Sequence, residues 1–378
     1  MVLWSMVVAL VTVSQDEAQP LRFEKVVLDA EHDFEAAGVA DVDRDGHLDV
    51  ISGSHWYRAP DWTPIPIREI PAMGGYRLDF ANVMLDVDGD RFPDVVSCNW
   101  HHRSVVWRRN PGRAGGEWSE FLVDAPGNME TALRVDVDGD GRLDFLPDVS
   151  KCVVWYRVHE PTTTPHTPPT PSLMLVRHEI STSVGGHGLG FGDVDGDGRA
   201  DVLKSSGWFG APEDRRAGEW NFHAEWNLGS AGIGILVHDV QGDGLADVIH
   251  GNGHAYGLYW QEQGREGETR TWTRHVIDES WSQAHCLQLV DLDGDGRPEV
   301  LTGKRRFAHN GNDPGGKEPS RLVVYRFDAT SQSFTAQVLD EGTEVGTGLA
   351  MAVEDVDGDG RLDIVAPGKT GLFLFLQR

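Results

Sequence analysis

The sequence predicts an all-β fold, a seven-bladed β-propeller, and two observations carry this prediction. An acidic pattern, DxDxDGxxD, recurs seven times along the 378 residues at intervals of 45 to 64 residues. Short runs rich in β-branched and aromatic residues flank each copy at similar offsets. A period of this length is typical of a supersecondary unit that packs against its neighbours in a ring or an array.

Each repeat is expected to supply four strands. In the fourth copy, GLGFG precedes the acidic loop and ADVLKS follows it, so the loop joins two antiparallel strands. A third apolar run comes next in most copies, as in SVVWRR, CVVWYR, YGLYWQ and LVVYRF. A fourth run begins with an aromatic or large apolar residue, as in WSEFLVDA, MLVRHEIS, WNFHAEWN, WTRHVIDE and FTAQVLDE. Four strands in each of seven repeats predict seven blades.

The two ends of the chain are complementary. The seventh repeat stops at Arg378 after its third strand, whereas FEKVVLDA at residues 23–30 is a fourth-type strand that stands before the first repeat. We therefore expect the N-terminal strand to complete the last blade and close the ring without exposed sheet edges. Residues 19–378 then form one domain, with the Pro/Thr-rich segment 161–171 as a long loop inside the third blade.

Residues 1–18 are predicted to be a signal peptide. Residues 1–15 carry no charged side chain and are mostly apolar, although a basic N-terminal region is missing. A buried first strand or a membrane anchor is the alternative, but the run is shorter than the ~20 residues that span a bilayer. We expect a secreted or periplasmic protein with no membrane partner once this segment is removed.

Composition excludes some partners. With 33 basic and 60 acidic side chains the formal net charge is −27, which argues against nucleic acid as a partner. The hydrophobic fraction of 39% and the 13 tryptophans indicate a globular chain. Three cysteines without a CxxC pair indicate neither a disulfide framework nor a thiolate zinc site. The oligomeric state stays open.

The acidic loops suit Ca²⁺. Alternating carboxylates around a glycine turn, followed by an acid at the ninth position, bring several oxygens to one centre. The expected calcium ligands are Asp41, Asp43, Asp45 and Asp49; Asp86, Asp88, Asp90 and Asp94; Asp136, Asp138, Asp140 and Asp144; Asp193, Asp195, Asp197 and Asp201; Asp239, Asp243 and Asp247; Asp291, Asp293, Asp295 and Glu299; and Asp355, Asp357, Asp359 and Asp363. The first, second and fifth copies depart from the pattern at Arg44, Arg91 and Gln241, so their occupancy is left open.

These loops resemble those of the FG-GAP or VCBS repeat propellers. In that family similar loops hold Ca²⁺ at the blade edges, as in the heads of integrin α-subunits. The resemblance implies a structural role for the loops and directs the search for chemistry to the opposite face.

Four polar residues share one position at the start of the predicted first strands. Six residues before the first aspartate of their own repeats stand Glu35, Glu130, His187 and His285, and the next positions on the same side of each strand are mostly apolar. Because the first strand of a blade lines the propeller axis, these side chains are expected at one mouth of the channel. Imidazole and carboxylate suit Zn²⁺ or a similar transition metal. The alternative is a set of solvated rim residues or core histidines.

The exits of the second strands add polar and aromatic residues on the same face. Rings that stack on a sugar, beside groups that bind its oxygens, predict a small carbohydrate as the partner. The expected substrate contacts are Trp56, Trp100, His101, Trp208, Tyr256 and Arg305.

A closer resemblance appears in GGHGLGFGDVDGDGRADVL, GNGHAYGLYWQEQ, WSQAHCLQLVDLDGDG, TGKRRFAHNGNDPG and VGTGLAMAVEDVDGDG. These strings are similar to the propeller domain of the fungal aldos-2-ulose dehydratases, which also act on 1,5-anhydrofructose. The resemblance implies a zinc that acts as a Lewis acid while water is eliminated from a keto-sugar. The fungal enzymes carry cupin and lectin-like domains that this chain lacks, so an isomerisation step is not implied.

This resemblance assigns roles. Glu130, His187 and His285 are expected to bind zinc, with Glu35 as a fourth ligand or as a partner of a ligand. The candidate acids and bases are His254, His55 and His309, and Lys304 could stabilise the enolate or the leaving oxygen. We therefore expect a carbon–oxygen lyase of the hydro-lyase type. Two alternatives stay open: a non-catalytic propeller that binds glycans or proteins, and a lyase or hydrolase acting on 3-keto-glycosides.

Overall fold

The computed structural model describes residues 20–159, 170–342 and 344–378. The predicted signal peptide, residues 1–18, and most of segment 161–171 lie outside the described residues. Strands dominate, and the helices among the described residues are short: η1 (Gly112–Ala114), α1 (Pro171–Met174) and η2 (Ala308–Gly311). No helix in this part of the chain is both long and apolar enough to span a membrane.

In the described part of the chain, four separate sheets have four antiparallel strands each. The first contains β2 (Ala37–Ala40), β3 (Asp49–Ser52), β4 (His55–Arg58) and β5 (Thr63–Pro66). The second contains β8 (Val83–Leu85), β9 (Asp94–Cys98), β10 (Val105–Arg109) and β11 (Ser119–Asp124). The third contains β12 (Met129–Val135), β13 (Asp144–Val149), β14 (Val153–Val158) and β15 (Leu175–Ser181). The fourth contains β28 (Ala352–Glu354), β29 (Asp363–Gly368), β30 (Gly371–Gln377) and β1 (Phe23–Asp29).

A twelve-stranded sheet contains three further antiparallel runs. They are β16 (Leu189–Gly192), β17 (Asp201–Lys204), β18 (Gly207–Gly210) and β19 (Asn221–His223); β20 (Ile233–His238), β21 (Asp247–Gly251), β22 (Tyr256–Glu266) and β23 (Thr269–Ser282); and β24 (Ala284–Val290), β25 (Glu299–Lys304), β26 (Ser320–Asp328) and β27 (Ser333–Gly342). Parallel pairing of β20 with β16 and with β24 joins these runs. A short hairpin is formed by β6 (Ala72–Met73) and β7 (Tyr76–Arg77).

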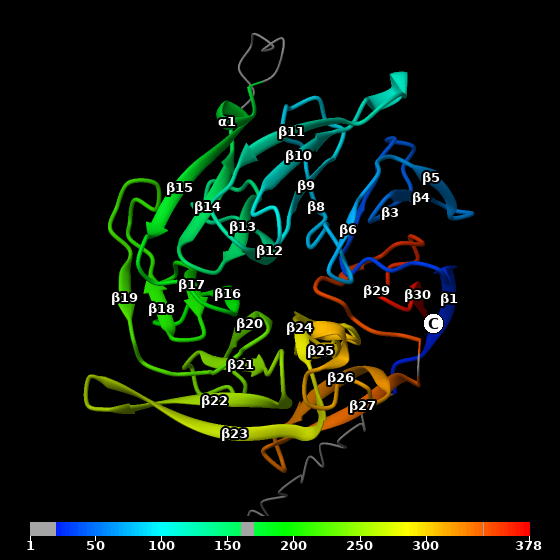
Figure 1. Cartoon of the computed structure of the whole chain (residues 1–378). Coiled ribbons are helices and arrows are strands. Elements are labelled where there is room, and N and C mark those ends of the chain that lie inside the picture. The colour runs from blue at the N-terminus through cyan, green and yellow to red at the C-terminus, as the bar shows by residue number, and fades with distance from the viewer. Residues whose placement is uncertain (1–19, 160–169, 343) are drawn as a thin grey trace, which may run out of the picture.

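The sheets are arranged around a common centre (Figure 1). A cavity of about 310 Å³ lies there, and its wall comes from the first strands β2, β8, β12, β20, β24 and β28. The arrangement is that of an all-β propeller. Each first strand runs toward an acidic loop, so the loops lie at one end of these strands and the strand starts lie at the other. For example, β12 begins beside Glu130 and is followed at once by Asp136.

The strand expected at residues 23–30 is β1, and its partner is the last strand of the chain. β1 pairs antiparallel with β30, from Phe23 opposite Gln377 to Asp29 opposite Leu372. Figure 1 shows β1, in blue, beside the red C-terminal strands. The first and the last segments of the described chain therefore belong to one sheet.

Tryptophans of the third strands fill the core of several sheets. Trp155 of β14 stacks on His178, Trp208 of β18 on His223 and Trp260 of β22 on His275, with ring centroids 4.4, 4.1 and 4.6 Å apart. Trp208 is fully buried. The prediction that Trp208 contacts substrate is therefore wrong, because its ring packs between sheets.

Candidate functional site

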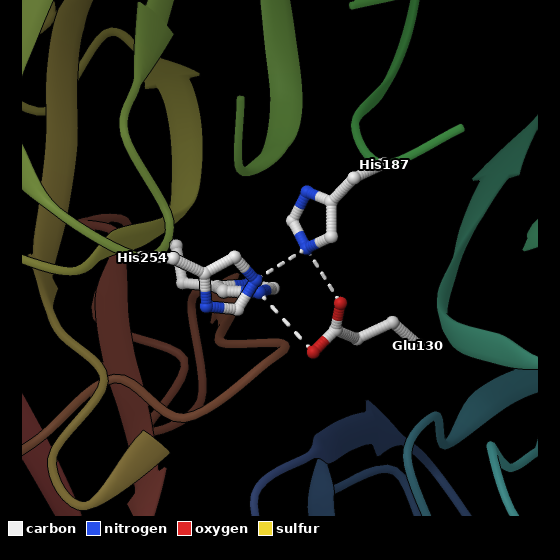
Figure 2. A group of neighbouring side chains, drawn as sticks. Glu130, His187 and His254 are labelled. Atoms are coloured by element: carbon white, nitrogen blue, oxygen red, sulfur yellow. Dashed lines mark hydrogen bonds and ion pairs between the residues drawn. The ribbon is translucent and has the colours of Figure 1, made fainter. Parts of the chain in front are cut away.

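Glu130, His187, His254 and His285 converge at the strand starts, opposite the acidic loops. The Nε2 atom of His187 lies 2.6 Å from Oε2 of Glu130 and 2.9 Å from Nε2 of His254. The Nε2 atom of His285 lies 3.4 Å from Oε1 of Glu130. One nitrogen or oxygen from each of the four residues lies within 4.8 Å of the others. Figure 2 shows Glu130, His187 and His254 pointing toward one another from separate parts of the chain. We call these four residues the ligand group.

Local structure explains how these side chains meet. Glu130 and His285 are second residues of the first strands β12 and β24, and His187 lies just before β16. His254 comes from the turn between β21 and β22. A Cβ atom on its neighbour Gly253 would lie 2.9 Å from the ring of His285, so the glycine leaves room for the turn beside that ring.

The outer nitrogens of two rings fix their tautomers. Nδ1 of His187 lies 2.5 Å from the carbonyl oxygen of Ala231, and Nδ1 of His254 lies 3.1 Å from Oδ2 of Asp313. Both partners are acceptors, so both Nδ1 atoms carry hydrogen and donate. In neutral rings both Nε2 atoms then present lone pairs. These lone pairs face each other and the Glu130 carboxylate, an arrangement that requires a cation between them, either a proton or a metal ion.

The chemistry of the ligand group fits Zn²⁺ or a similar metal. Imidazole nitrogen and carboxylate oxygen are the preferred non-thiolate ligands of zinc, and an outer carbonyl or carboxylate on each histidine is typical of such sites. Burial lowers the pKa of His285 to about 3, so this ring is neutral. Burial alone would lower the pKa of His187, but the hydrogen bond and charge of Glu130 raise it. A proton on His187 therefore competes with a metal ion.

Arg305 is buried behind the ligand group and connects three sheets. Its Nε lies 2.9 Å from Oε1 of Glu35, and its Nη1 lies 2.5 Å from Oε1 of Glu130 and 3.2 Å from Nε2 of His285. Glu35 is held by this guanidinium and lies outside the ligand group, which corrects its predicted role as a fourth ligand. Arg305 is 1% exposed, so its predicted role as a substrate contact is also wrong. It orients Glu130 so that Oε2 faces the histidines.

The predicted acid and base candidates fall in different places. His254 belongs to the ligand group itself. His309 stacks on His254, with ring centroids 4.5 Å apart and an interplanar angle of 12°. Lys304 is buried, and its Nζ donates to Ser282 Oγ at 2.9 Å and to the carbonyl oxygen of Gly315 at 2.6 Å. The ammonium of Lys304 is thus already satisfied by the protein.

The remaining predicted residues are dispersed. His55 and Trp56 begin β4, where His55 packs beside Tyr57 and Trp56 packs against a core cluster. Trp100 and His101 lie in the turn between β9 and β10, and Trp100 is 39% exposed. The hydroxyl of Tyr256 donates to Glu318 at 2.5 Å. No described contact joins any of these five residues to the ligand group.

The sequence reasoning missed two residues of this face. Asp313 bonds both His254 and His309, and the signal for it was an acid four residues after His309 in a glycine-rich segment. Tyr76 comes from the β6–β7 hairpin, and Lys369 Nζ lies 3.6 Å from the centroid of its ring. Nothing in the repeat pattern points to Tyr76, because the hairpin lies outside the four-strand period.

The acidic loops use their carboxylates in two ways. First-position acids hold the turn: Asp193 accepts from the amides of Gly196 and Gly198, each at 2.8 Å. Ninth-position acids are buried and bond to the backbone, as Asp201 does with the amides of Val194 and Ala211, each at 2.9 Å. In this copy each carboxylate oxygen of the ninth acid accepts from one backbone amide, which holds the strand connections together.

Groups of three acids lie close enough to share an ion in several loops. They include Asp41, Asp43 and Asp45; Asp86, Asp88 and Asp90; and Asp136, Asp138 and Asp144. In the first two loops an arginine from the third strand contacts the acids: Arg58 lies 2.7 Å from Asp43, and Arg109 lies 2.5 Å from Asp88. A guanidinium thus offsets part of the negative charge in these loops.

Comparison with known proteins supports the repeats. The family of FG-GAP-like repeats matches residues 86–146 and 216–302, so the chain contains FG-GAP-like repeats in an all-β propeller. No curated protein sequence matches the chain significantly. A solved structure of an Agrocybe aegerita lectin, described as recognising non-reducing terminal N-acetylglucosamine, is 18% identical with a TM-score of 0.47, and the match covers 84% of this chain and 81% of that one.

Proposed function

We propose that this chain is a metal-dependent carbon–oxygen lyase that removes water from a keto-sugar. The observation that carries the proposal is the 2.9 Å approach of the Nε2 atoms of His187 and His254. Both Nδ1 atoms act as donors, so each Nε2 atom presents a lone pair to the other. A cation between these atoms would offset the repulsion, and two imidazole nitrogens beside the Glu130 carboxylate suit a metal ion.

Each residue of the site has a part in this proposal. A bound divalent ion would polarise a carbonyl oxygen and make the neighbouring C–H bond acidic. His187, His254 and Oε2 of Glu130 would hold the ion, and His285 completes the ligand group on the buried side. Arg305 neutralises Glu35 and steadies Glu130, while Ala231 and Asp313 fix the orientation of two rings.

The keto-sugar substrate, such as 1,5-anhydrofructose or an aldos-2-ulose, is proposed from the strings that resemble those of aldos-2-ulose dehydratases. Two of these strings, GNGHAYGLYWQEQ and TGKRRFAHNGNDPG, contain His254 and the segment from Arg305 to Asp313 that surrounds it. The half-buried ring of Tyr76 adds an aromatic surface on the same face. A lyase or hydrolase acting on 3-keto-glycosides would use the same acidified C–H bond.

A non-catalytic glycan- or protein-binding propeller is the second candidate. The match to FG-GAP-like repeats favours it, because the repeats account for the scaffold without any chemistry. The exposed indole of Trp100 gives such a propeller a surface on which a sugar ring could stack. Metal content and turnover separate the two candidates.

We also propose seven blades, with β1 completing the last, from the seven acidic repeats and the pairing of β1 with β30. Calcium in the acidic loops is proposed from the convergent acids at positions one, three and five. A signal peptide at residues 1–18, and hence export, is proposed from the apolar and uncharged start of the chain.

The experiment is metal analysis of the purified protein followed by incubation with 1,5-anhydrofructose. We expect one transition-metal ion per chain and growing ultraviolet absorbance from an enone. A His187→Gln variant should lose both signals. A His47→Gln variant changes an exposed histidine at the far, acidic-loop end and should keep them. Protein that contains calcium alone and leaves the sugar unchanged would favour the binding propeller instead.

A further inference from the structure

Asp313 connects the ligand group to an outer histidine. Its Oδ2 accepts from Nδ1 of His254 at 3.1 Å, and its Oδ1 accepts from Nδ1 of His309 at 2.9 Å. The two imidazole rings stack, and His309 lies on the outer side with its side chain 56% exposed. One carboxylate thus holds two parallel histidines, of which His254 belongs to the ligand group and His309 is exposed to solvent.

The nitrogens of these two rings have different uses. His254 has none free, because Nδ1 is taken by Asp313 and Nε2 faces His187. His309 uses Nδ1 for Asp313, so its Nε2 remains for an outside molecule. An imidazole whose Nδ1–H is held by a carboxylate and whose Nε2 is open has the arrangement of a general base.

The backbone around His309 is held in an uncommon conformation. Phe307, His309 and Asn310 all have positive φ, at 59°, 47° and 57°. Asn310 is tied across the mouth by a hydrogen bond from Nδ2 to the carbonyl oxygen of Gly74, at 3.2 Å. Residues without glycine's freedom keep such angles when surrounding contacts impose them, and these positions concentrate at functional sites.

The other histidines of this face do not fit the role. His285 is buried and accepts from Arg305. His187 directs Nδ1 to Ala231 and Nε2 to Glu130. His55 packs within β4. Among the histidines that the structure describes, His309 combines contact with the ligand group and an accessible nitrogen.

We propose that His309, positioned by Asp313, is the group that carries the proton during the elimination. This assignment rests on the proposed lyase function. Nε2 of His309 takes the hydrogen from the carbon next to the carbonyl as a proton, and the C–H electron pair forms the C=C bond of the enolate. The β-C–O bond then breaks with its electron pair on oxygen. That oxygen receives the proton from His309 and leaves as water, so a keto-sugar gives an enone and water.

The test follows by NMR, in D₂O and in protein with measured metal content, how fast 1,5-anhydrofructose loses its α-hydrogen. This loss is called exchange below, whether deuterium replaces the hydrogen or elimination of water removes it. The variants are His309→Gln, His309→Gly and Asp313→Asn, and the control is His102→Gln, an exposed histidine in the β9–β10 turn. We expect His309→Gln to keep its metal and lose about 100-fold or more in exchange rate. Added imidazole should restore exchange in His309→Gly, which a purely structural role would not allow.

The outcomes are distinct. Full exchange by metal-loaded His309→Gln overturns the role of His309 and leaves the lyase proposal standing. No exchange by metal-loaded wild-type protein overturns the lyase proposal and the role of His309 with it. Two transition-metal ions per chain, with one lost in both His309→Gln and Asp313→Asn, would show that His254, His309 and Asp313 bind a second metal, and this also overturns the proposal.

Discussion

The Nε2 atoms of His187 and His254 face each other at 2.9 Å, although the chain positions of the two residues are 67 apart. Their Nδ1 atoms donate to Ala231 and Asp313, so in the neutral rings the facing Nε2 atoms carry lone pairs. Mutual repulsion would open this contact unless a cation offset it. The relationship makes the propeller mouth a candidate metal centre.

The ligand group predicts unequal effects of its histidines on metal affinity. His254→Gln should weaken zinc binding by more than about 100-fold, because it removes a direct ligand. Loss of a residue that only hydrogen-bonds to a ligand costs about 10- to 100-fold. His285→Gln should weaken it about 10-fold or less, because Nε2 of His285 already accepts from Arg305. Competition with a chromophoric chelator measures both affinities. Equal losses in the two variants would show that His285 binds as strongly as His254.

Arg305 is predicted to be central to stability. Arg305→Met leaves Glu35 and Glu130 buried without their cation, which should lower the free energy of unfolding by about 3–5 kcal/mol. The matched control is Arg134→Met at the other end of the channel. Arg134 is 37% exposed and pairs with Glu354 at 3.3 Å, so its loss should cost under about 1 kcal/mol. Urea unfolding of both variants is the measurement, and similar losses would contradict the structural role given to Arg305.

The effect of calcium on thermal stability should differ between two acids of one loop. Asp195→Asn changes a third-position acid, so it should lower the melting temperature in calcium and have little effect in excess chelator. Asp201→Asn should cost about 1–3 kcal/mol in both conditions, because an amide nitrogen would face a backbone donor. Thermal melts of both variants with and without chelator give the answer. If Asp195→Asn behaves identically in the two buffers, the loop does not bind calcium.

The buried ring of His250 should make the folded protein less stable in acid. The ring is 3% exposed and accepts from Nε2 of Gln261 at 3.1 Å, and burial lowers its pKa from 6.5 to about 4. At pH values between these two pKa values His250 binds a proton in the unfolded chain but not in the folded one. The free energy of unfolding therefore falls as the pH falls. From pH 7 to 4.5 this residue should remove roughly 2 to 3 kcal/mol.

The measurement is the difference in unfolding free energy between wild type and His250→Gln at the two pH values. Glutamine keeps an acceptor for Gln261 and does not titrate. Other titrating groups contribute equally to both proteins and cancel. A difference that stays constant with pH would mean that His250 binds its proton as readily in the folded protein as in the unfolded chain.

The repeat pattern made the all-β propeller predictable from sequence. Equal offsets from the acidic loops also placed Glu130, His187 and His285 at the same end of their strands. The pattern could not give contacts made outside the period. Arg305 meets Glu35 across 270 positions, and His254 comes from a turn whose Gly253 packs against the ring of His285. Trp208 was misjudged because the third strand faces the core between sheets, which alternation alone does not reveal.

The central claim is that a metal ion lies between His187, His254 and Glu130. Anomalous diffraction at the zinc absorption edge, from crystals of zinc-loaded protein, tests it most directly. We predict a peak about 2.0–2.1 Å from the Nε2 atoms of His187 and His254 and in contact with Oε2 of Glu130. Crystals that contain zinc elsewhere but show no peak between these atoms would mean that a shared proton holds the histidines together, and would contradict the account.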